Sequence, residues 1–329
     1  HLYRSAAGKK PVVVTRVGLG TFADPRHGGG KMNALAEEDF VDVVTIDEKE
    51  YLQYRTPKID VCFIRGTTAD PMGNITAEKE AAYIDALQLA LATKANGGKV
   101  IVQVERTTTR RAHCKEILIP YLAVDCIVID PEQRQTYIEP HNSAYSGHTI
   151  MPAEHIGAHM QAVLEKSGGF TPTRTLEHYI IARRAASELK PGFVVNIGIG
   201  IPGLIPGIAA ETGLQDQIHM TNEAGTIGGT PAPAGSFGAS INPAFMTDMS
   251  TMFDLYDGGM LDMVCVGAAQ IDGEGNVNVS IIGSKVVGVG GFVNLTSAAR
   301  KVVFLTTFTA KGLKTSYQQD QLKIETEGS

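Results

Sequence analysis

The stretch HMTNEAGTIGG, residues 219–229, places one carboxylate, Glu223, between a short apolar strand and a glycine-rich loop. A carboxylate in such a place could act as a nucleophile, or it could bind a polar group of a ligand. The glycines that follow it would let a ligand approach the backbone closely. The role of Glu223 therefore has to be inferred from the segments around it.

The spacing upstream of Glu223 matches a dinucleotide-binding pattern. The segment VVNIGIGIPG follows an expected strand, opens an expected helix and fits G-x-G-x-x-G at Gly198, Gly200 and Gly203. Glu223 lies 20 residues beyond the last glycine, where such folds place the acid that binds the ribose of NAD. An NAD-dependent dehydrogenase using Gly198–Gly203 and Glu223 is thus one hypothesis, although the glycine-rich loop after the acid and a proline inside the motif count against it.

Two histidines could suggest a metal site. His155 and His159 are four residues apart in AEHIGAHM, a helical spacing that could direct two imidazoles at one ion. No acid stands in an HExxH arrangement, and the segment lies outside the regular α/β pattern. We expect a surface or interface helix here and no metal.

The composition is that of a globular α/β protein. Of the 329 residues, 43% are hydrophobic, 19% are charged and 36 are glycine. At roughly 100–200 residues per domain, this length suggests two domains. The net charge of -6 and the absence of a basic run argue against a nucleic-acid partner.

The sequence also bears on the compartment. It contains no run of about 18 apolar residues and begins with no secretory pattern, so we expect no membrane partner. The four cysteines, Cys62, Cys114, Cys126 and Cys265, are widely spaced and form no CxxC pair. A reducing cytoplasm is therefore expected.

Strand-like and helix-like segments alternate along the chain, as in a mostly parallel sheet. In the first half, strands are expected at 11–20, 59–66 and 99–105 and a helix at 78–98; in the second, helices at 175–189 and from Pro202 and strands at 193–200 and 217–222. A turn-rich stretch separates the two halves. The expected division is a first domain over 1–140, an interdomain linker over 141–172 and a second domain over 173–329.

The second half repeats the first. Asp60–Thr76 aligns with Met263–Asn278 around an Asp-x-x-Gly-Asn turn, which places Asn74 and Asn276 202 positions apart. The lysines that begin KVIVQV and KVVFLT are separated by the same 202 positions. One shared offset between two landmarks predicts two related open α/β domains with mostly parallel sheets.

Six motifs in collinear order give the chain a resemblance to the family I coenzyme A transferases of the fused single-chain type. They are FIRGTTADPMGNIT with EKEA, VNIGIGIP, NEAGTIGG, GGMLDMVCVGAAQIDGEGNVN, GSKVVGVGGFVNL and KVVFLTTFTAKG. The resemblance runs from about residue 10 to 312, and the branch includes acetate, propionate and 3-oxoacid CoA-transferases of short-chain fatty acid and ketone body metabolism. A sugar-phosphate isomerase-like protein or a non-catalytic relative remains an alternative.

The resemblance implies a role for each of several residues. Glu223 would be the nucleophile that carries coenzyme A as a glutamyl-CoA thioester in a ping-pong reaction. Gly291 would supply an oxyanion-stabilising amide, and Asn196 would line the acyl site. Gly198, Gly200, Gly225 and Gly290 would shape the loops around the bound CoA and acyl group.

The resemblance also implies the partners. These are an acyl-CoA (acetyl-, propionyl-, butyryl- or acetoacetyl-CoA) and a short carboxylic acid, with CoA as a substrate, no cofactor and a homo-oligomeric assembly. The motif Asn222-Glu223-Ala224-Gly225 replaces the Ser-Glu-Asn-Gly of many members. Family chains also extend beyond both ends of this sequence, so a first strand-helix unit and the closing elements of the second domain are expected to be missing from it.

Overall fold

The computed structural model describes residues 1–167, 175–283, 285–307, 314–318 and 320–326. Its largest sheet has six strands in the order β16-β13-β12-β11-β17-β22. Their bounds are Phe245–Met246, Thr226–Ile227, His219–Asn222, Val194–Ile197, Met263–Gly267 and Lys301–Leu305. The four strands from β12 to β22 are parallel; at one edge β13 pairs antiparallel with β12, and β16 pairs antiparallel with β13.

Helices cover both faces of this sheet. One face carries α4 (Leu176–Ala186) and α5 (Ile205–Glu211); the other carries α6 (Met249–Leu255), the π-turn η6 (Tyr256–Met260) and α7 (Phe292–Ala298). Successive side chains of a strand point to opposite faces. In β17, Met263 and Cys265 accordingly pack on the α4–α5 side, whereas Val264 and Val266 pack on the α6–α7 side. Burial on both faces explains the continuous apolar run in this strand.

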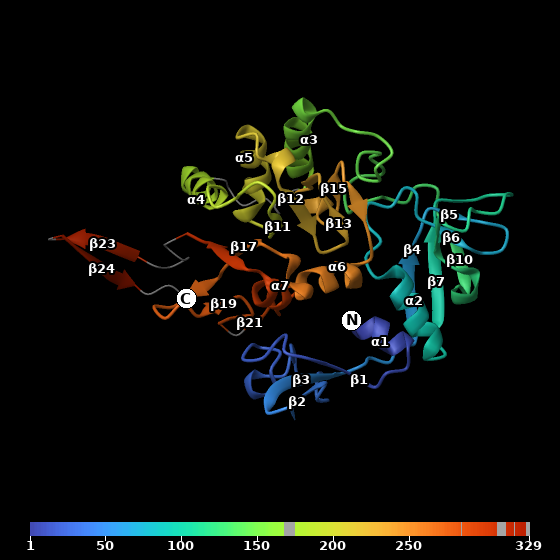
Figure 1. The fold of residues 1–329 in the computed structure, drawn as a ribbon, viewed down its shortest axis with the longest axis horizontal. Helices are drawn as coiled ribbons and strands as arrows, with labels where there is room; N and C mark the ends of the chain where they lie inside the picture. The colour runs from blue at the N-terminus through green and yellow to red at the C-terminus, as the bar shows by residue number, and fades with distance from the viewer. Residues whose placement is uncertain (168–174, 284, 308–313, 319, 327–329) are drawn as a thin grey trace.

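The first half has a smaller parallel sheet in the order β10-β7-β4, with bounds Cys126–Ile129, Lys99–Val104 and Val61–Arg65. Helix α2 (Ala86–Ala95) covers the face that carries Cys62 and Ile64. On the other face of β4, Val61 and Phe63 are exposed. Figure 1 shows this sheet to one side of the molecule and the six-stranded sheet to the other, with α6 and α1 (Leu2–Ala7) between them.

The duplication is visible in the strand register. Val61 pairs with Lys99 between β4 and β7, and Met263 pairs with Lys301 between β17 and β22. Both pairs obey the offset of 202 predicted from the sequence. Since both sheets are built on the same parallel pair, the predicted fold class of two related α/β domains is confirmed.

The repeated turn has one geometry in two settings. Asp70 Oδ1 accepts the backbone N–H groups of Met72 and Asn74, and Asn74 Nδ2 donates to Asp70 Oδ2 over 3.0 Å. Asp272 and Asn276 form the same bonds. The first turn joins β5 (Thr68–Ala69) to β6 (Ile75–Thr76), and this hairpin lies between β8 (Arg106–Thr107) and β9 (Ile117–Ile119). The second turn joins β18 (Gln270–Ile271) to β19 (Val277–Asn278), and among the described strands these two pair only with each other.

The helix predicted over 78–98 begins later than expected. Residues 78–85 are not helical, because Glu78 accepts hydrogen bonds from the hydroxyls of Thr68 and Thr76 and Ile84 has a φ of 51°. This segment, 78–85, is called the strap below. The expected glycine stop is present, since Gly97 follows the helix with a φ of 76°.

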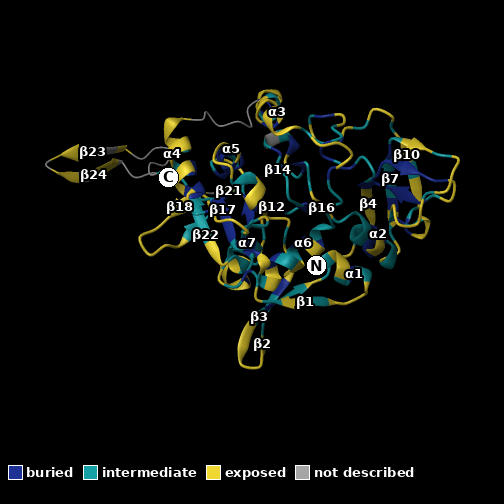
Figure 2. Ribbon diagram, turned by 45° about the horizontal axis from the view of Figure 1, so that its top comes forward, coloured by how far each residue is buried: buried dark blue, intermediate teal, exposed yellow. Residues whose placement is uncertain are grey.

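The strand predicted at 11–20 is present as the shorter β1 (Val12–Thr15), but it lies in an antiparallel sheet that was not predicted. This sheet has the order β1-β3-β2, in which β3 spans Lys49–Arg55 and β2 spans Val41–Ile46. Its tight turn uses Asp47 and Glu48 with φ values of 48° and 62° instead of the glycine or asparagine that marks most such turns. Figure 2 shows the tip of the β2–β3 hairpin and the β23 (Lys314–Gln318) and β24 (Gln321–Thr326) hairpin as exposed, in contrast to the largely buried strand β7.

The interval expected to be a linker contains helix α3 (Ala153–Lys166). Ile156 of this helix joins a buried cluster with Ala81 of the strap and Ile241 of the second half. The last residues of the interval, 168–172, and the end of the last motif, 308–312, lie outside the described residues. The domain boundaries stay a prediction.

The remaining described elements are short. They are η1 (Pro25–His27), η2 (Tyr121–Ala123), η3 (Pro202–Leu204), η4 (Gln215–Gln217), η5 (Ala234–Ser236), β14 (Thr230–Pro231), β15 (Ser240–Ile241), β20 (Ile281–Ile282) and β21 (Lys285–Val286). Within the described ranges, no helix has the length and apolar character needed to cross a membrane.

The two copies of the turn offer a matched stability test. Asn74 is buried and its Oδ1 accepts the backbone N–H of Tyr121 over 3.0 Å, whereas Asn276 is exposed. Replacing Asn74 by Ala removes, at a buried position, the hydrogen bonds to Asp70 Oδ2 and to the N–H of Tyr121, so we expect Asn74→Ala to lower the free energy of unfolding by about 1–3 kcal/mol. Asn276→Ala should cost less than about 1 kcal/mol. Urea denaturation measures both, and equal losses would contradict the assigned difference in burial.

Candidate active site

The position of Glu223 follows from strand alternation. In β12, Met220 packs on the α4–α5 side, so Thr221 and, one step past the strand, Glu223 face the α6–α7 side. In β11, Val195 packs on the α4–α5 side and Asn196 therefore faces the same way as Glu223. Asn196 is the direct partner of Thr221 in the parallel register. The sheet thus brings three polar side chains together on one face.

The chain turns sharply at Glu223. Asn222 shapes this turn, because its Oδ1 accepts the N–H of Ala224 over 2.9 Å and its carbonyl accepts the N–H of Gly225 over 3.0 Å. Gly225 has a φ of 117°, and a Cβ on it would lie 1.9 Å from the carbonyl oxygen of Thr247. A side chain is excluded at this position, which explains the glycine of the NEAG motif.

The Glu223 carboxyl group is largely withdrawn from water. The residue keeps partial exposure, but its Oε2 atom is buried and has no hydrogen-bond partner. Burial raises the pKa of Glu223, and hydrogen bonds from its own backbone N–H and, to a smaller extent, from the Asn196 amide oppose that rise in part. No salt bridge to Glu223 is found among the described residues. Such a carboxylate is poorly solvated and therefore more basic and more reactive than one in water.

Gly291 and Asn196 both lie beside Glu223, as the resemblance implies. A Cβ on Gly291 would lie 3.8 Å from Glu223 Cγ and 3.4 Å from Phe253 Cζ. Gly291 precedes α7, so the start of this helix faces the carboxylate. The roles assigned to Gly291 and Asn196 remain predictions, but their proximity to Glu223 is a feature of the fold.

The other predicted glycines lie on loops near the carboxyl ends of the parallel strands. Gly198 continues β11 and donates its N–H to the carbonyl of Cys265 over 2.8 Å. Gly200 and Gly290 have φ values of 88° and 52°, in the region that favours glycine. No contact described for these three residues reaches Glu223, and their roles in binding stay predictions.

Two further polar residues adjoin the site and were missed in the sequence. Tyr256 is fully buried, and its hydroxyl donates to Thr221 Oγ1 over 2.9 Å. The charge of Glu223 contributes to a raised pKa of Tyr256, behind the larger effect of burial. Thr221 could have been found from its shared alternation with Glu223. Tyr256 could not, because it reaches the site from a distant segment.

The strap brings the first half of the chain against the turn that carries Glu223. The backbone N–H of Ile84 donates to the carbonyl of Ala224 over 3.2 Å, and the carbonyl of Ile84 accepts the N–H of Met249 over 2.7 Å. A β-branched residue with a positive φ is strained, so the surrounding structure must hold it in place. These two bonds connect Glu223's turn to the other half of the molecule.

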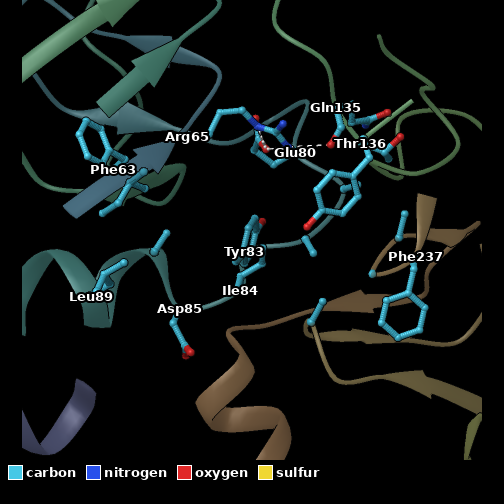
Figure 3. A pocket seen from close by; sticks show the side chains of 18 of the residues that line it. Phe63, Arg65, Glu80, Tyr83, Ile84, Asp85, Leu89, Gln135, Thr136 and Phe237 are labelled. Carbon is cyan, nitrogen blue, oxygen red and sulfur yellow. Dashed lines mark hydrogen bonds and ion pairs between the residues drawn. The ribbon is translucent and has the colours of Figure 1, made fainter. Parts of the chain in front are cut away.

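A cleft of about 620 Å³ adjoins the same turn. Ala224 and Phe237 border it from the second half, and β4 and the strap border it from the first. Figure 3 shows Tyr83, Ile84 and Asp85 of the strap across from Phe237, with the ion pair of Arg65 and Glu80 (2.7 Å) in the far wall. The lining is largely apolar and aromatic, so the cleft can receive a ligand group next to Ala224, the residue that follows Glu223.

The predicted helix with His155 and His159 holds one of these rings in a polar cluster. His159 Nε2 lies 2.8 Å from the Tyr145 hydroxyl and 3.5 Å from Glu139. Throughout the part of the chain that the structure describes, no group of three or more His, Cys, Asp or Glu side chains could hold a metal ion.

The fold agrees with what the chain resembles among known proteins. A family model described as coenzyme A transferase matches residues 3–130 and 179–311. The chain therefore belongs to the coenzyme A transferase family. The matched region includes Glu223. Membership of this family gives no support to the dehydrogenase hypothesis.

Particular relatives are similar over almost the whole chain. Caffeate CoA-transferase of Acetobacterium woodii is 41% identical and covers 100% of this chain and 62% of its own length. Acetate CoA-transferase YdiF of Escherichia coli K12 is 38% identical, with 99% and 59% covered. The crystal structure of the acyl-CoA transferase YdiF apoenzyme from Escherichia coli O157:H7 superposes with a TM-score of 0.82 at 37% identity, covering 99% of this chain and 59% of that one. The chain thus spans about three fifths of the length of the relatives it matches.

Gly225 can be tested against another glycine with positive φ. Gly225→Ala should lower the free energy of unfolding by about 1–3 kcal/mol more than Gly200→Ala, since only the former drives a methyl group into a backbone carbonyl. A Cβ on Gly200 meets no atom within 4 Å. Thermal unfolding of both variants measures the difference, and similar losses would argue against the tight turn.

The raised pKa of Glu223 predicts a pH-dependent stability difference. The folded state binds this proton more tightly than the unfolded chain, so the contribution to stability is present below the unfolded pKa and is lost as the pH rises through the folded one. At pH 7 we expect Glu223→Gln to be more stable than the wild type. The gap should close as the pH falls below the ordinary value of 4.5.

Denaturant titrations from pH 4 to pH 8 measure this gap. The exposed Glu274→Gln serves as the control for the loss of one charge. A gap that is absent at pH 7, or that widens toward low pH, would contradict the burial of the Glu223 charge.

Proposed function

We propose that this protein transfers coenzyme A from a short-chain acyl-CoA to a carboxylic acid, by a ping-pong mechanism through a glutamyl-CoA thioester on Glu223. The observation that carries the proposal is the partly desolvated Glu223 carboxylate at the end of β12, next to Asn196 and the Gly291 backbone. Membership of the coenzyme A transferase family supports the reaction class.

The first half-reaction moves CoA onto the enzyme. A Glu223 carboxylate oxygen attacks the acyl-CoA carbonyl carbon, the carbon–sulfur bond breaks, and a mixed anhydride and CoA thiolate form. The thiolate then attacks the glutamyl carbonyl carbon and releases the first acid as a carboxylate. The enzyme is left as a thioester. Splitting the transfer in this way replaces one difficult step with easier ones.

The second half-reaction runs the same steps in reverse order. The incoming carboxylate attacks the glutamyl thioester and expels CoA thiolate, again leaving a mixed anhydride. The thiolate attacks the carbonyl carbon on the substrate side, which forms the new acyl-CoA and restores the Glu223 carboxylate. No proton or electron is gained or lost overall, so the chemistry calls for no redox cofactor.

Two neighbours would stabilise the charge that develops. Each attack creates an oxyanion, and hydrogen-bond donors fixed at that point lower the barrier. The N–H of Gly291 and the side-chain amide of Asn196 are the proposed donors, supported by their position beside Glu223. The cleft beside Ala224 would receive part of the substrate.

The identities of the acyl-CoA donor and of the acceptor acid are part of the proposal. The relatives described above are named for caffeate and for acetate at similar identity, so similarity alone does not choose between an aromatic and a short aliphatic acid. We propose acetyl-, propionyl-, butyryl- or acetoacetyl-CoA as donors, a cytoplasmic location and a homo-oligomer. An activity screen of acyl-CoA donors against carboxylic acid acceptors identifies the substrate pair.

The mechanism is tested by trapping the thioester. The full-length gene product is incubated with acetyl-CoA, treated with borohydride or hydroxylamine, and mapped by mass spectrometry. We expect modification at Glu223 only. Glu223→Gln should abolish the label and lower transfer at least about a thousandfold, because the nucleophile is gone.

Two variants sharpen the result. Glu223→Asp withdraws the carboxylate by one methylene, and a misplacement of this size should cost roughly a hundredfold in rate. Glu139→Gln alters another buried glutamate outside the site and should keep the label at Glu223. An acyl-CoA-dependent label elsewhere, or none at all, would sink the proposal, and tight NAD binding would revive the dehydrogenase.

A further inference from the structure

A chain of three buried hydrogen bonds runs beneath Glu223. Asn196 Nδ2 donates to the Tyr256 hydroxyl over 3.3 Å, Tyr256 donates to Thr221 Oγ1 over 2.9 Å, and Thr221 donates to the carbonyl of Val195 over 3.1 Å. The side chains of Asn196, Thr221 and Tyr256 are at most 1% exposed. Water does not reach these groups, so each depends on its protein partner.

The last acceptor fixes the direction of the whole chain. The carbonyl of Val195 can only accept, so the single proton of Thr221 points toward it. The Tyr256 proton then points to Thr221, which leaves the Tyr256 oxygen free to accept from Asn196. The Asn196 amide is thereby oriented with Nδ2 toward Tyr256. Asn196 Nδ2 also lies 3.5 Å from the carbonyl oxygen of Thr221.

This orientation matters because two acceptors remain unpaired at the site. Asn196 Oδ1 and Glu223 Oε2 are both buried without a hydrogen-bond partner. The Asn196 side chain lowers the pKa of Glu223 as a hydrogen-bond donor, which only Nδ2 can be, so a half-turn of the amide would put the acceptor Oδ1 in the place of this donor. Two oxygen acceptors would then face each other in a poorly solvated place, which is unfavourable.

We propose that Tyr256 is a positioning residue for the Glu223 site: its hydroxyl holds the Asn196 amide with the nitrogen available to the carboxylate. The catalytic consequence rests on the proposed function of Glu223, whereas the orientation of Asn196 does not. Tyr256 touches no reacting atom. It acts through Asn196, and it reaches the site from η6 on the helical layer that covers this face of the sheet.

Tyr256→Phe removes the hydroxyl and keeps the ring. The ring packs edge-on against Phe253 at 5.6 Å between centroids, a contact that phenylalanine retains. The Asn196 amide then loses its nearer acceptor and can rotate. We expect kcat to fall about ten- to a hundredfold with KM for acyl-CoA within about twofold, since the oriented amide acts on the transition state.

The matched control is Tyr145→Phe. Tyr145 is also fully buried, and its hydroxyl bonds to Glu139 and His159 in the cluster with α3. This variant loses buried hydrogen bonds of the same kind away from Glu223, so it should leave kcat unchanged. A second matched pair keeps the test valid if Tyr256→Phe does not fold. Thr221→Val removes the hydroxyl that accepts from Tyr256 and should lower kcat to the same extent as Tyr256→Phe. Thr221→Ser keeps a hydroxyl and should not lower kcat in this way.

A double-mutant cycle tests whether Tyr256 acts through Asn196. In an Asn196→Ala background, Tyr256→Phe should have little further effect on kcat, because the group it orients is absent. Independent, multiplying effects of the two substitutions would overturn the proposal. So would a Tyr256→Phe enzyme with wild-type kcat.

One measurement separates this proposal from the proposed function. The pKa of Glu223 is read in the ligand-free protein by infrared difference spectroscopy between each protein and its Glu223→Gln counterpart. Tyr256→Phe should raise this pKa above the wild-type value, and Tyr145→Phe should not. If thioester trapping fails but this shift is present, the positioning role stands without the transferase mechanism. If trapping succeeds and the shift is absent, the positioning role is refuted alone.

Discussion

The parallel pairing of β11 with β12 is the constraint on which the site depends. Asn196 and Thr221 face each other in this register, and Glu223 follows two residues later on the same side. Val195 and Met220, one residue earlier in each strand, are buried against α4 and α5. A slip of one residue would send the polar groups into that apolar layer. The core therefore specifies the register, and the register specifies the site.

The site also shows why a carboxylate stands at a strand end. A charge in the middle of β12 would be buried on both sides, which is very costly without a counter-charge. At the end of the strand, Glu223 keeps partial exposure while Gly291, at the start of α7, packs against its side chain. The apolar residues of the same layer supply the stability that offsets the cost. The result is a carboxylate that is reactive yet tolerated by the fold.

The sequence predicted those strands and turns that are controlled by local sequence patterns. Alternation and glycine placement located β11, β12 and the turn at Glu223, and the shared offset located the duplicated strands. The strap was mistaken for helix because its apolar spacing is helical, whereas hydrogen bonds from Thr68 and Thr76 to Glu78 hold it in turns and bends. The β2–β3 hairpin lacks the usual turn residues. Tyr256 gave no signal, since only the packing of η6 on the sheet brings it to Thr221.

The strap has a consequence for how the site assembles. Ile84 bridges Ala224 and Met249 through backbone hydrogen bonds, so residues from both halves are needed to complete the turn around Glu223. Since both halves belong to one polypeptide, this contact is intramolecular, and its strength is set by an effective concentration rather than by the amount of protein present. Dilution therefore leaves this contact intact. The covalent connection between the two halves keeps the contact formed, and the contact holds Ile84 in its strained backbone conformation.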